Sequence, residues 1–327
     1  MTVALSELLE TARVVALPLA TRFRGIDVRE AMLLRGPAGW TEFSPFVEYD
    51  DAEAAAWLSA AIDFGWREIV LKKSAPTHIR VNATLPAVAA DAVNGVLDRF
   101  PGCRTVKVKV AEAGQSLADD VARVSRAREY LGPDGRIRVD ANGGWNVDEA
   151  EHAVHALAEF DLEYVEQPCA TVDELAHIRK RVKYMGIPIA ADESVRKAAD
   201  PIAVARAKAA DILIIKAQPL GGIASALKIV KKAKLPVVVS SALDTSVGLS
   251  MGAYLAASIR GGVSFDSGLA TAALLAADVT TAPLLPVDGQ IEVRRVDVDE
   301  ELLEQYAASP ERAEWWLSRL RRTHALL

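Results

Sequence analysis

The feature that most constrains the fold of this chain is a regular alternation of short apolar runs with helix-like segments. Each apolar run ends in one or more polar residues. These ends fall 24 to 31 residues apart, at Asn82, Lys107 and Lys109, Asp140, Glu166, Asp192, Lys216, Ser240 and Asp266. Eight strand-plus-helix units over about 200 residues are typical of a parallel (β/α)₈ barrel. An open doubly wound sheet also alternates strands and helices, but it seldom has eight such even units, and no GxGxxG loop follows a strand here.

The N-terminal part of the chain follows a different pattern. Residues 17–46 alternate apolar and polar positions around a Gly-Pro-Ala-Gly turn at 36–39, which predicts an antiparallel meander. A helix-like stretch follows at 50–66, and the C-terminal tail is also helix-like. We therefore expect an α/β protein with a small α+β capping domain at 1–80, a (β/α)₈-type (TIM) barrel at 81–289, and a tail at about 290–327 that packs peripherally.

The amino-acid composition and net charge limit the kinds of partner that we expect. The net charge is −6, the sequence pI is about 5.5, and no block of basic residues is present, so nucleic acid and anionic membranes are not expected partners. No apolar run approaches the roughly 20 residues that cross a bilayer, and acidic residues, not a basic segment, precede the first apolar stretch. With no export signal indicated, Cys103 and Cys169 are expected to be reduced thiols in a cytoplasmic protein. The sequence does not indicate an oligomeric state.

Charged side chains mark the ends of five consecutive predicted strands. In chain order they are Lys107 and Lys109, Asp140, Glu166, Asp192 and Lys216. Working residues of barrels lie at these carboxyl ends, so the three carboxylates would converge and repel one another unless a cation lay between them. Oxygen ligands without His or Cys favour Mg²⁺, for which Mn²⁺ can substitute. Alternation along the strand allows only one of Asp192 and Glu193 to point inward, and spacing alone leaves that choice open.

The segment TVKVKV at 105–110 directs two ammonium groups to one side of a strand, because Lys107 and Lys109 are two residues apart. A lysine acts as a base only when neutral, and its ordinary pKa near 10.4 is too high for that. A second ammonium, a divalent ion and partial desolvation all lower this pKa. Lys109, nearer the strand end, is therefore the better candidate for the base. A single Asp at a strand end is more often the N-cap of the next helix, and a single Lys in a strand more often lies on a solvated edge. Charged residues at the ends of five consecutive strands instead favour a catalytic site.

The motifs around these residues resemble the enolase superfamily, and within it the muconate-lactonising-enzyme subgroup. They are the K-x-K at 107–109, VDAN at 139–142, VEQP at 165–168, ADES at 191–194 and IIKAQPLGG at 214–222. The resemblance implies a capping domain on a barrel, with Asp140, Glu166 and Asp192, in preference to Glu193, as ligands of Mg²⁺. It also implies Lys109 as the base and Lys216 as a lysine on the opposite side of a small carboxylate substrate.

Three further segments are similar to one branch of the subgroup: RGPAGWTEFSPF at 35–46, VNATLP at 81–86 and SSALDTSVGL at 240–249. This similarity implies dehydration of a succinyl-hydroxycyclohexadiene carboxylate in menaquinone biosynthesis, with Lys109 removing the proton α to the carboxylate and Mg²⁺ stabilising the enediolate. The alternative on the same scaffold is an N-acylamino-acid racemase or a dipeptide epimerase. The epimerases resemble one another in an Asp-x-Asp on the eighth strand, where this chain has Asp266-Ser267-Gly268. A non-catalytic relative is disfavoured, because every expected catalytic position is intact.

Several other residues are candidates for substrate contacts. They are Arg138, Ser240, Ser241, Asp244, Thr245, Ser246, Arg22 and Arg24. Arg138 points into the predicted barrel, where an internal ion pair is an equal alternative. The residues at 240–246 follow the seventh strand and could bind a carboxylate or simply cap the next helix; at Asp244 related sequences commonly have Glu. The two arginines occupy the part of the capping domain that covers the active site in this superfamily, although surface arginines are common.

Overall fold

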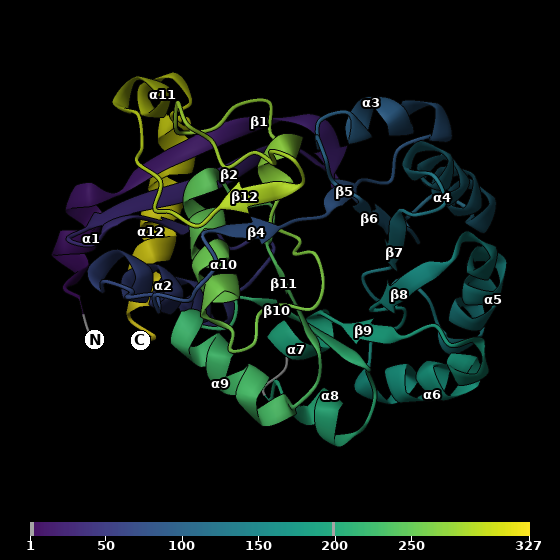
Figure 1. Cartoon of the computed structure of the whole chain (residues 1–327). Coiled ribbons are helices and arrows are strands. Elements are labelled where there is room, and N and C mark those ends of the chain that lie inside the picture. Colours follow the sequence, from purple (N-terminus) through teal and green to yellow (C-terminus); the bar gives the residue numbers. More distant parts are fainter. Residues whose placement is uncertain (1–2, 198–199) are drawn as a thin grey trace.

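The computed structural model describes residues 3–197 and 200–327 (Figure 1). Its N-terminal part is an antiparallel sheet in the order β1-β2-β3, with a long helix packed against it. The elements are α1 (Leu5–Thr11), β1 (Arg13–Phe23), β2 (Ile26–Gly36), β3 (Gly39–Phe43) and α2 (Asp51–Trp66). Gly39, with a φ of +125°, allows the tight reversal between β2 and β3. Asp50 begins α2 by accepting a hydrogen bond from the Glu53 backbone N–H. The predicted meander and the helix after it are confirmed.

In the described part of the chain, seven parallel strands form the larger sheet. In chain order they are β5 (Ala83–Leu85), β6 (Thr105–Lys109), β7 (Arg136–Asp140), β8 (Leu162–Glu166), β9 (Ile189–Ala191), β10 (Ile212–Lys216) and β11 (Val237–Ser240). Consecutive strands are neighbours throughout, and their many Val, Ile and Leu residues are buried, as expected for strands covered on both faces. Isolated parallel bridges from Val81 to Ser267 and from Ser240 to Gly268 join one further segment to both edges and close the sheet. The predicted (β/α)₈-type barrel is confirmed.

The first barrel strand ends later than expected. The predicted end at Asn82 is wrong, because the chain continues in extended form to Leu85. The Asn82 amide group donates to the Ala83 carbonyl and is 1% exposed, so it lies inside the barrel below the strand ends. Thr84 instead pairs in register with Lys107 and lies at the level of the predicted site.

The eighth segment also differs from the prediction. It makes only isolated bridges, and its carboxyl end is Gly268, not Asp266. Asp266 lies near the start of β6, where its carboxylate accepts from Thr105 Oγ1 at 2.6 Å and pairs with Arg80 Nε at 2.9 Å. These contacts hold Asp266 at the amino-terminal end of the barrel, far from the strand ends that carry the lysines.

Helices cover the outside of the barrel (Figure 1). They are α3 (Val93–Leu97), α4 (Leu117–Leu131), α5 (Val147–Leu157), α6 (Val172–Val182), α7 (Glu193–Arg196), α8 (Ala203–Arg206), α9 (Ile223–Ala233) and α10 (Ser246–Ser258), with 3₁₀ turns at Ala90–Ala92, Ala158–Phe160, Lys183–Met185 and Thr271–Leu274. The helix expected between the strands that end at Asp192 and Lys216 is two short helices, α7 and α8. Residues 198–199, which this prediction includes, lie outside the described part. The expected eighth helix is only the 3₁₀ turn at Thr271–Leu274.

The C-terminal tail packs on the capping sheet. β12 (Gln290–Glu292) pairs antiparallel with β4 (His78–Arg80), and α11 (Glu300–Gln305) and α12 (Pro310–His324) follow. Trp316 and Leu320 of α12 are fully buried. Glu30 of β2 accepts from Arg312 Nη2 at 2.6 Å and from Trp316 Nε1 at 2.9 Å. The tail therefore contributes to the core of the cap, while the domain limits at residues 80 and 289 stay predictions.

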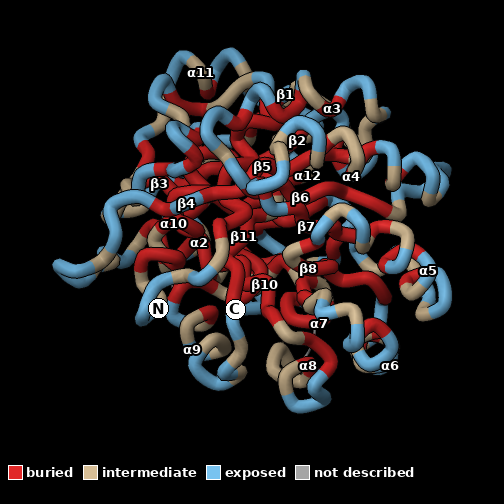
Figure 2. The backbone as a smooth tube through the Cα atoms, turned by 45° about the vertical axis from the view of Figure 1, so that its right-hand side comes forward, coloured by how far each residue is buried: buried red, intermediate tan, exposed pale blue. Residues whose placement is uncertain are grey.

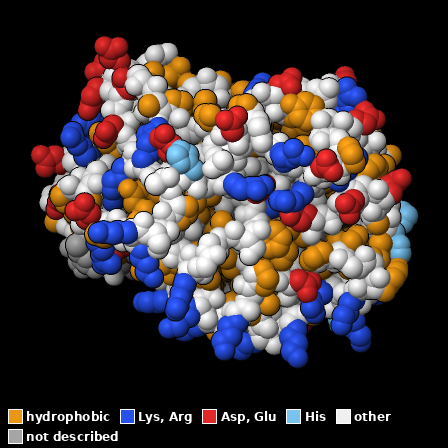
Figure 3. Space-filling model, in the orientation of Figure 1, with side chains coloured by type: hydrophobic (Ala, Val, Ile, Leu, Met, Phe, Trp, Pro, Cys, Tyr) orange, Lys and Arg blue, Asp and Glu red, His pale blue; other side chains and the backbone are white. Residues whose placement is uncertain are grey.

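Burial is concentrated where the strands meet. Figure 2 shows β5 to β11 as the buried centre, with helices whose outer faces are exposed around it. On the face seen in Figure 3, acidic and basic side chains are interspersed, and Lys and Arg also gather along the lower edge, over α8 and α9. Across the described residues, no helix combines the length and apolar character that crossing a membrane requires.

Candidate active site

The ends of β6, β7 and β8 bring two lysines against two carboxylates. Lys107 Nζ lies 2.9 Å from Asp140 Oδ2 and 3.0 Å from Glu166 Oε1. Lys109 Nζ lies 2.5 Å from the same Asp140 oxygen and donates to Asn142 Oδ1 at 2.6 Å. In-register pairing of the three strands places Lys109, Asp140 and Glu166 side by side. The predicted convergence of these side chains is therefore a consequence of strand register.

The other half of the cluster comes from β10 and the segment after β9. Lys216 Nζ lies 2.5 Å from Asp192 Oδ2, and Arg196 Nε lies 3.3 Å from Asp192 Oδ1. The Glu193 carboxylate accepts from Asn142 and from Arg196. Both Asp192 and Glu193 line the same pocket. The expectation that only one of them points inward is wrong, because β9 ends at Ala191 and strand alternation no longer applies.

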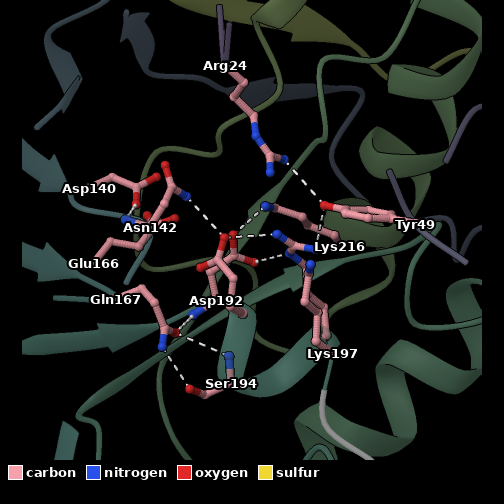
Figure 4. A network of polar contacts seen from close by, with 12 residues as sticks. Arg24, Tyr49, Asp140, Asn142, Glu166, Gln167, Asp192, Ser194, Lys197 and Lys216 are labelled. Atoms are coloured by element: carbon pink, nitrogen blue, oxygen red, sulfur yellow. Dashed lines mark hydrogen bonds and ion pairs between the residues drawn. The ribbon is translucent and has the colours of Figure 1, made fainter. Parts of the chain in front are cut away.

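The side chain of Gln167 fixes the backbone that carries Asp192. Its Oε1 accepts from the N–H groups of Asp192 at 3.0 Å and Ser194 at 3.2 Å. Its Nε2 donates to Ser194 Oγ at 2.7 Å and to the Cys169 carbonyl at 2.8 Å. Figure 4 shows Gln167 below Asp192 in this arrangement. The Gln of the VEQP motif is thus a support for the next strand end.

Burial and mutual charge set the protonation of the cluster. Burial works against the charge of Asp140, but Lys107 and Lys109 outweigh it and hold its pKa well below the ordinary value. Burial and then the charge of Asp140 raise the pKa of Glu166 to about 7. Burial would lower the pKa of Lys107, yet Asp140 and Glu166 raise it well above its usual range. Burial, aided by Lys107, lowers the pKa of Lys109 despite Asp140. The pKa of Lys109 is therefore below its ordinary value and the pKa of Lys107 above it, so Lys109 is the better candidate for the base, as predicted.

Two of the three carboxylates retain an oxygen atom that a cation can use, whereas both oxygens of Asp140 accept hydrogen bonds. Glu166 Oε2 and Asp192 Oδ1 are buried without a hydrogen-bond partner, and buried polar atoms normally have one. Within the described residues, no group of three or more His, Cys, Asp or Glu side chains already has the arrangement of a metal site. Lys107 and Lys216 draw the other oxygens of these carboxylates toward themselves. The donor set suits a hard divalent ion, and binding one requires these ion pairs to loosen.

A pocket lies above the cluster, between the barrel and the cap. Its cavity volume is about 30 Å³, so a small-molecule ligand can enter only if the covering side chains move apart. The cap contributes Phe23, Arg24 and Phe46. The barrel contributes Thr84, Lys107, Lys109, Asn142, Asp192, Glu193, Arg196, Lys216, Ser240, Ser241, Ala242, Leu243, Gly268 and Thr271.

Tyr49 links two arginines at this pocket, and the sequence pattern did not indicate it. Its hydroxyl accepts from Arg24 Nη1 at 3.3 Å and from Arg196 Nη1 at 3.0 Å, as Figure 4 shows for Arg24. Lys197 Nζ lies 4.2 Å from the centre of its ring. Arg196 was detectable in principle, because it follows Asp192 by one helical turn. Tyr49 had no such signal, since its position depends on how the cap meets the barrel.

The remaining predicted substrate contacts fall into two groups. Arg24, Ser240 and Ser241 line the pocket, and the Ser241 hydroxyl donates to the Gly268 carbonyl at 2.7 Å. Arg22 pairs with Asp27 on the surface, where its side chain is 66% exposed. It does not line this pocket.

Arg138 and residues 244–246 of the turn after β11 also lie outside the pocket lining. Arg138 is fully buried inside the barrel and donates to Glu163 Oε2 at 2.5 Å. Thr245 caps α10 by accepting from the Val247 N–H, and the Ser246 hydroxyl donates to Asp278. Asp244 is buried behind the pocket wall, beside a small void. These positions match the structural alternatives, an internal ion pair and a helix cap.

Comparison with known proteins places the chain among relatives over nearly its whole length. The family described as "Enolase C-terminal domain-like" matches residues 88–297, and "Enolase N-terminal domain-like" matches residues 14–65. The chain is 52% identical to o-succinylbenzoate synthase of Mycolicibacterium smegmatis over 329 residues, covering 99% of this chain and 98% of the relative. It is 53% identical to o-succinylbenzoate synthase of Thermobifida fusca over 305 residues, covering 92% of each.

Solved structures share the fold at lower identity. Muconate lactonizing enzyme from Pseudomonas putida has a TM-score of 0.72 at 18% identity, covering 91% of this chain and 98% of that structure. The L-Ala-D/L-Glu epimerase from Bacillus subtilis also has a TM-score of 0.72, at 22% identity, covering 88% and 96%. At these identities the similarity concerns the barrel and its cap, and not the reaction.

Proposed function

The chain belongs to the enolase superfamily, and on this premise we propose that it catalyses the reaction of the o-succinylbenzoate synthases. This reaction is the dehydration of 2-succinyl-6-hydroxy-2,4-cyclohexadiene-1-carboxylate to 2-succinylbenzoate in menaquinone biosynthesis. The observation that carries the proposal is the 52% identity to such a synthase over 99% of the chain. The lysines and carboxylates that proton abstraction requires lie together at one end of the barrel.

Lys109 is proposed as the base that removes the proton α to the ring carboxylate. Lys109 is 8% exposed and burial lowers its pKa, which brings the pKa of the amine closer to working pH. The electrons of the broken C–H bond first delocalise onto the ring carboxylate and then form the new ring double bond as the C–O bond breaks. Lys109, now protonated, returns its proton to the departing hydroxide, which leaves as water. Lys107 keeps the carboxylates beneath in place through its two ion pairs.

Lys216 is proposed to face the ring from the side opposite Lys109, where its charge can contact the developing aromatic ring. Arg24 of the cap is proposed to bind the succinyl carboxylate, with Ser240 and Ser241 on the facing wall. The support for this assignment is that all four side chains line the one pocket.

We propose that Asp140, Glu166 and Asp192 hold one Mg²⁺, for which Mn²⁺ can substitute. The oxygens of Glu166 and Asp192 that accept no hydrogen bond support this, as does the repulsion from Asp140 that helps raise the pKa of Glu166. When bound, the ion supplies positive charge where negative charge develops on the substrate carboxylate.

A cytoplasmic location is also part of the proposal and is supported by two cysteines that form no disulfide, Cys103 and Cys169.

The pocket lacks the second acidic residue that dipeptide epimerases have on the eighth strand. The position of the second acidic residue of the epimerase pair is Gly268, which lines the pocket, and Asp266 is held by Arg80 at the other end of the barrel. No carboxylate from this segment therefore faces a substrate ammonium. N-acylamino acids carry no ammonium, so racemisation of these compounds needs a direct test.

The test is a spectrophotometric assay of the purified chain with Mg²⁺ and the cyclohexadiene substrate, run beside N-succinylamino acids. We expect fast formation of the aromatic product and racemisation that is slower by at least tenfold. Racemisation without aromatisation would reject the proposed reaction while keeping the base, the opposite lysine and the carboxylates.

A further inference from the structure

A buried polar cluster joins the capping sheet to the pocket wall. We call it the interdomain clamp. It consists of Arg29 on β2, Glu42 and Ser44 on and after β3, and the loop at 242–245 after β11. Arg29 is 2% exposed, and Glu42 and Ser44 are fully buried. The clamp connects parts of the chain that lie about 200 residues apart.

Arg29 binds the backbone of the loop. Its Nε donates to the Leu243 carbonyl at 3.0 Å, and its Nη2 reaches the Ala242 carbonyl at 3.4 Å. The same Nη2 donates to Ser44 Oγ at 3.0 Å and to the Ser44 carbonyl. A planar guanidinium with fixed donor directions therefore sets the position of two loop carbonyls relative to the cap.

Glu42 binds the start of α10 from the other side of the loop. Its Oε2 accepts from Thr245 Oγ1 at 2.5 Å, from the Thr245 N–H at 3.1 Å and from the Gly248 N–H at 3.2 Å. A Cβ at Gly248 would lie 2.8 Å from this oxygen, so glycine leaves room for the carboxylate. The capping domain thus satisfies the first backbone donors of a barrel helix.

The loop that the clamp holds is strained and forms part of the pocket. Leu243 has a φ of +61°, a conformation that a branched, bulky residue rarely adopts. Such residues persist only where the surroundings fix them, and they are concentrated at functional sites. Leu243 and its neighbour Ala242 line the pocket, whereas Arg29 and Glu42 do not.

We propose that Arg29 and Glu42 are positioning residues that hold Leu243 in its left-handed conformation and thereby set the wall against which the substrate binds. The inference rests on the proposed function, because it concerns the same pocket. The clamp contacts neither Lys109 nor the carboxylates that flank it. Loosening it should therefore weaken substrate binding more than it slows the chemical step.

A neighbouring cluster between β2 and α12 is a purely structural contact of the capping sheet. Glu30, next to Arg29 on β2, accepts from Arg312 and Trp316 of α12 and touches no part of the pocket. Glu30→Gln should lower the melting temperature without changing KM. It is the matched control for Arg29→Met and Glu42→Ala.

The experiment measures kcat and KM for dehydration in the wild type, Arg29→Met, Glu42→Ala and Glu30→Gln. For the two clamp variants we expect KM to rise about tenfold, with kcat within about threefold of wild type. A tenfold change corresponds to about 1.4 kcal/mol, which is within the strain that a residue in this conformation stores. A wild type that does not dehydrate the substrate would reject the proposed function, and the same variants would then be compared by binding of 2-succinylbenzoate.

A double-mutant cycle separates positioning of Leu243 from general stabilisation. Glycine adopts a positive φ without strain, so in a Leu243→Gly background Arg29→Met should raise KM by less than threefold. An equal rise in both backgrounds, or a KM in Arg29→Met that stays at the wild-type value while the melting temperature falls, would overturn the proposal. If Arg29→Met does not fold, Arg29→Lys retains the charge and part of the donor set. It should give an intermediate KM, and a wild-type KM would overturn the proposal equally.

Discussion

Replacing Arg138 with Met should destabilise the fold strongly and leave substrate binding unchanged. Arg138 is fully buried and donates to Glu163 Oε2 at 2.5 Å, to Asn82 Oδ1 at 2.9 Å and to the Asp266 carbonyl at 2.8 Å. Removing one partner of a buried ion pair costs about 3–5 kcal/mol. The Glu163 side chain is 18% exposed and can regain some water, which lowers that cost. Asn82 and the carbonyl cannot, and each unpaired buried acceptor costs about 1–3 kcal/mol. Together these costs predict a loss of at least about 3 kcal/mol.

Urea unfolding of Arg138→Met and Arg136→Met tests this value. The Arg136 side chain is 48% exposed and lies 3.8 Å from the carboxylates of both Glu163 and Asp266, so its replacement should cost less than about 1 kcal/mol. Because Arg138 does not line the pocket, KM should be unchanged in both variants. A loss below about 1 kcal/mol for Arg138→Met would refute the reasoning from burial. A selective rise in its KM would show that Arg138 contacts the substrate after all.

Three further predictions concern Glu42, Arg24 and the metal. Burial and then Asp244 raise the pKa of Glu42 from 4.5 to about 7, against the opposing charge of Arg29. The folded state therefore holds this proton more tightly, and stability falls as pH rises from about 4.5 to about 7. Urea unfolding measures the free energy of unfolding of the wild type and of Glu42→Gln between pH 5 and pH 8. The decrease over this range should be smaller in Glu42→Gln by about 2–3 kcal/mol. An equal decrease in both proteins would contradict the prediction. Arg24→Gln should raise KM about 10- to 100-fold with little change in kcat, as expected for loss of a charged hydrogen bond; an unchanged KM would remove Arg24 from the site. Dialysis against EDTA should abolish activity. Mg²⁺ at 100 times its Kd should stabilise the wild type by about 2.7 kcal/mol and should not stabilise Asp192→Asn. Equal stabilisation of both proteins would place the ion at another site.

Much of the fold could be predicted because the barrel strands are regular. Strand alternation put Lys107 and Lys109 on one side, and in-register pairing then placed Lys109 beside Asp140. The eighth segment makes only isolated bridges, so spacing could not show that Gly268, and not Asp266, is at its carboxyl end. Irregular segments of this kind carry too few backbone pairs for a period to reveal their register.

The contacts of the cap could not be predicted from the pattern. Tyr49 meets Arg196 across 147 residues of sequence, and Arg29 meets Leu243 across 214. Such contacts depend on how two separately patterned parts of the chain pack against each other. Local periodicity contains no information on that geometry, so the residues that shape the pocket were harder to identify than those at its base.

The most direct test of the central claim is kcat for aromatisation of the cyclohexadiene substrate by the wild type and by Lys109→Gln. Lys232→Gln, on the outer helix α9, is the matched control. We expect Lys109→Gln to lose at least about 10³-fold in kcat, within the range for removal of a general base, and the control to match wild type. A Lys109→Gln variant that keeps more than about a tenth of the wild-type kcat would contradict the assignment of Lys109 as the base.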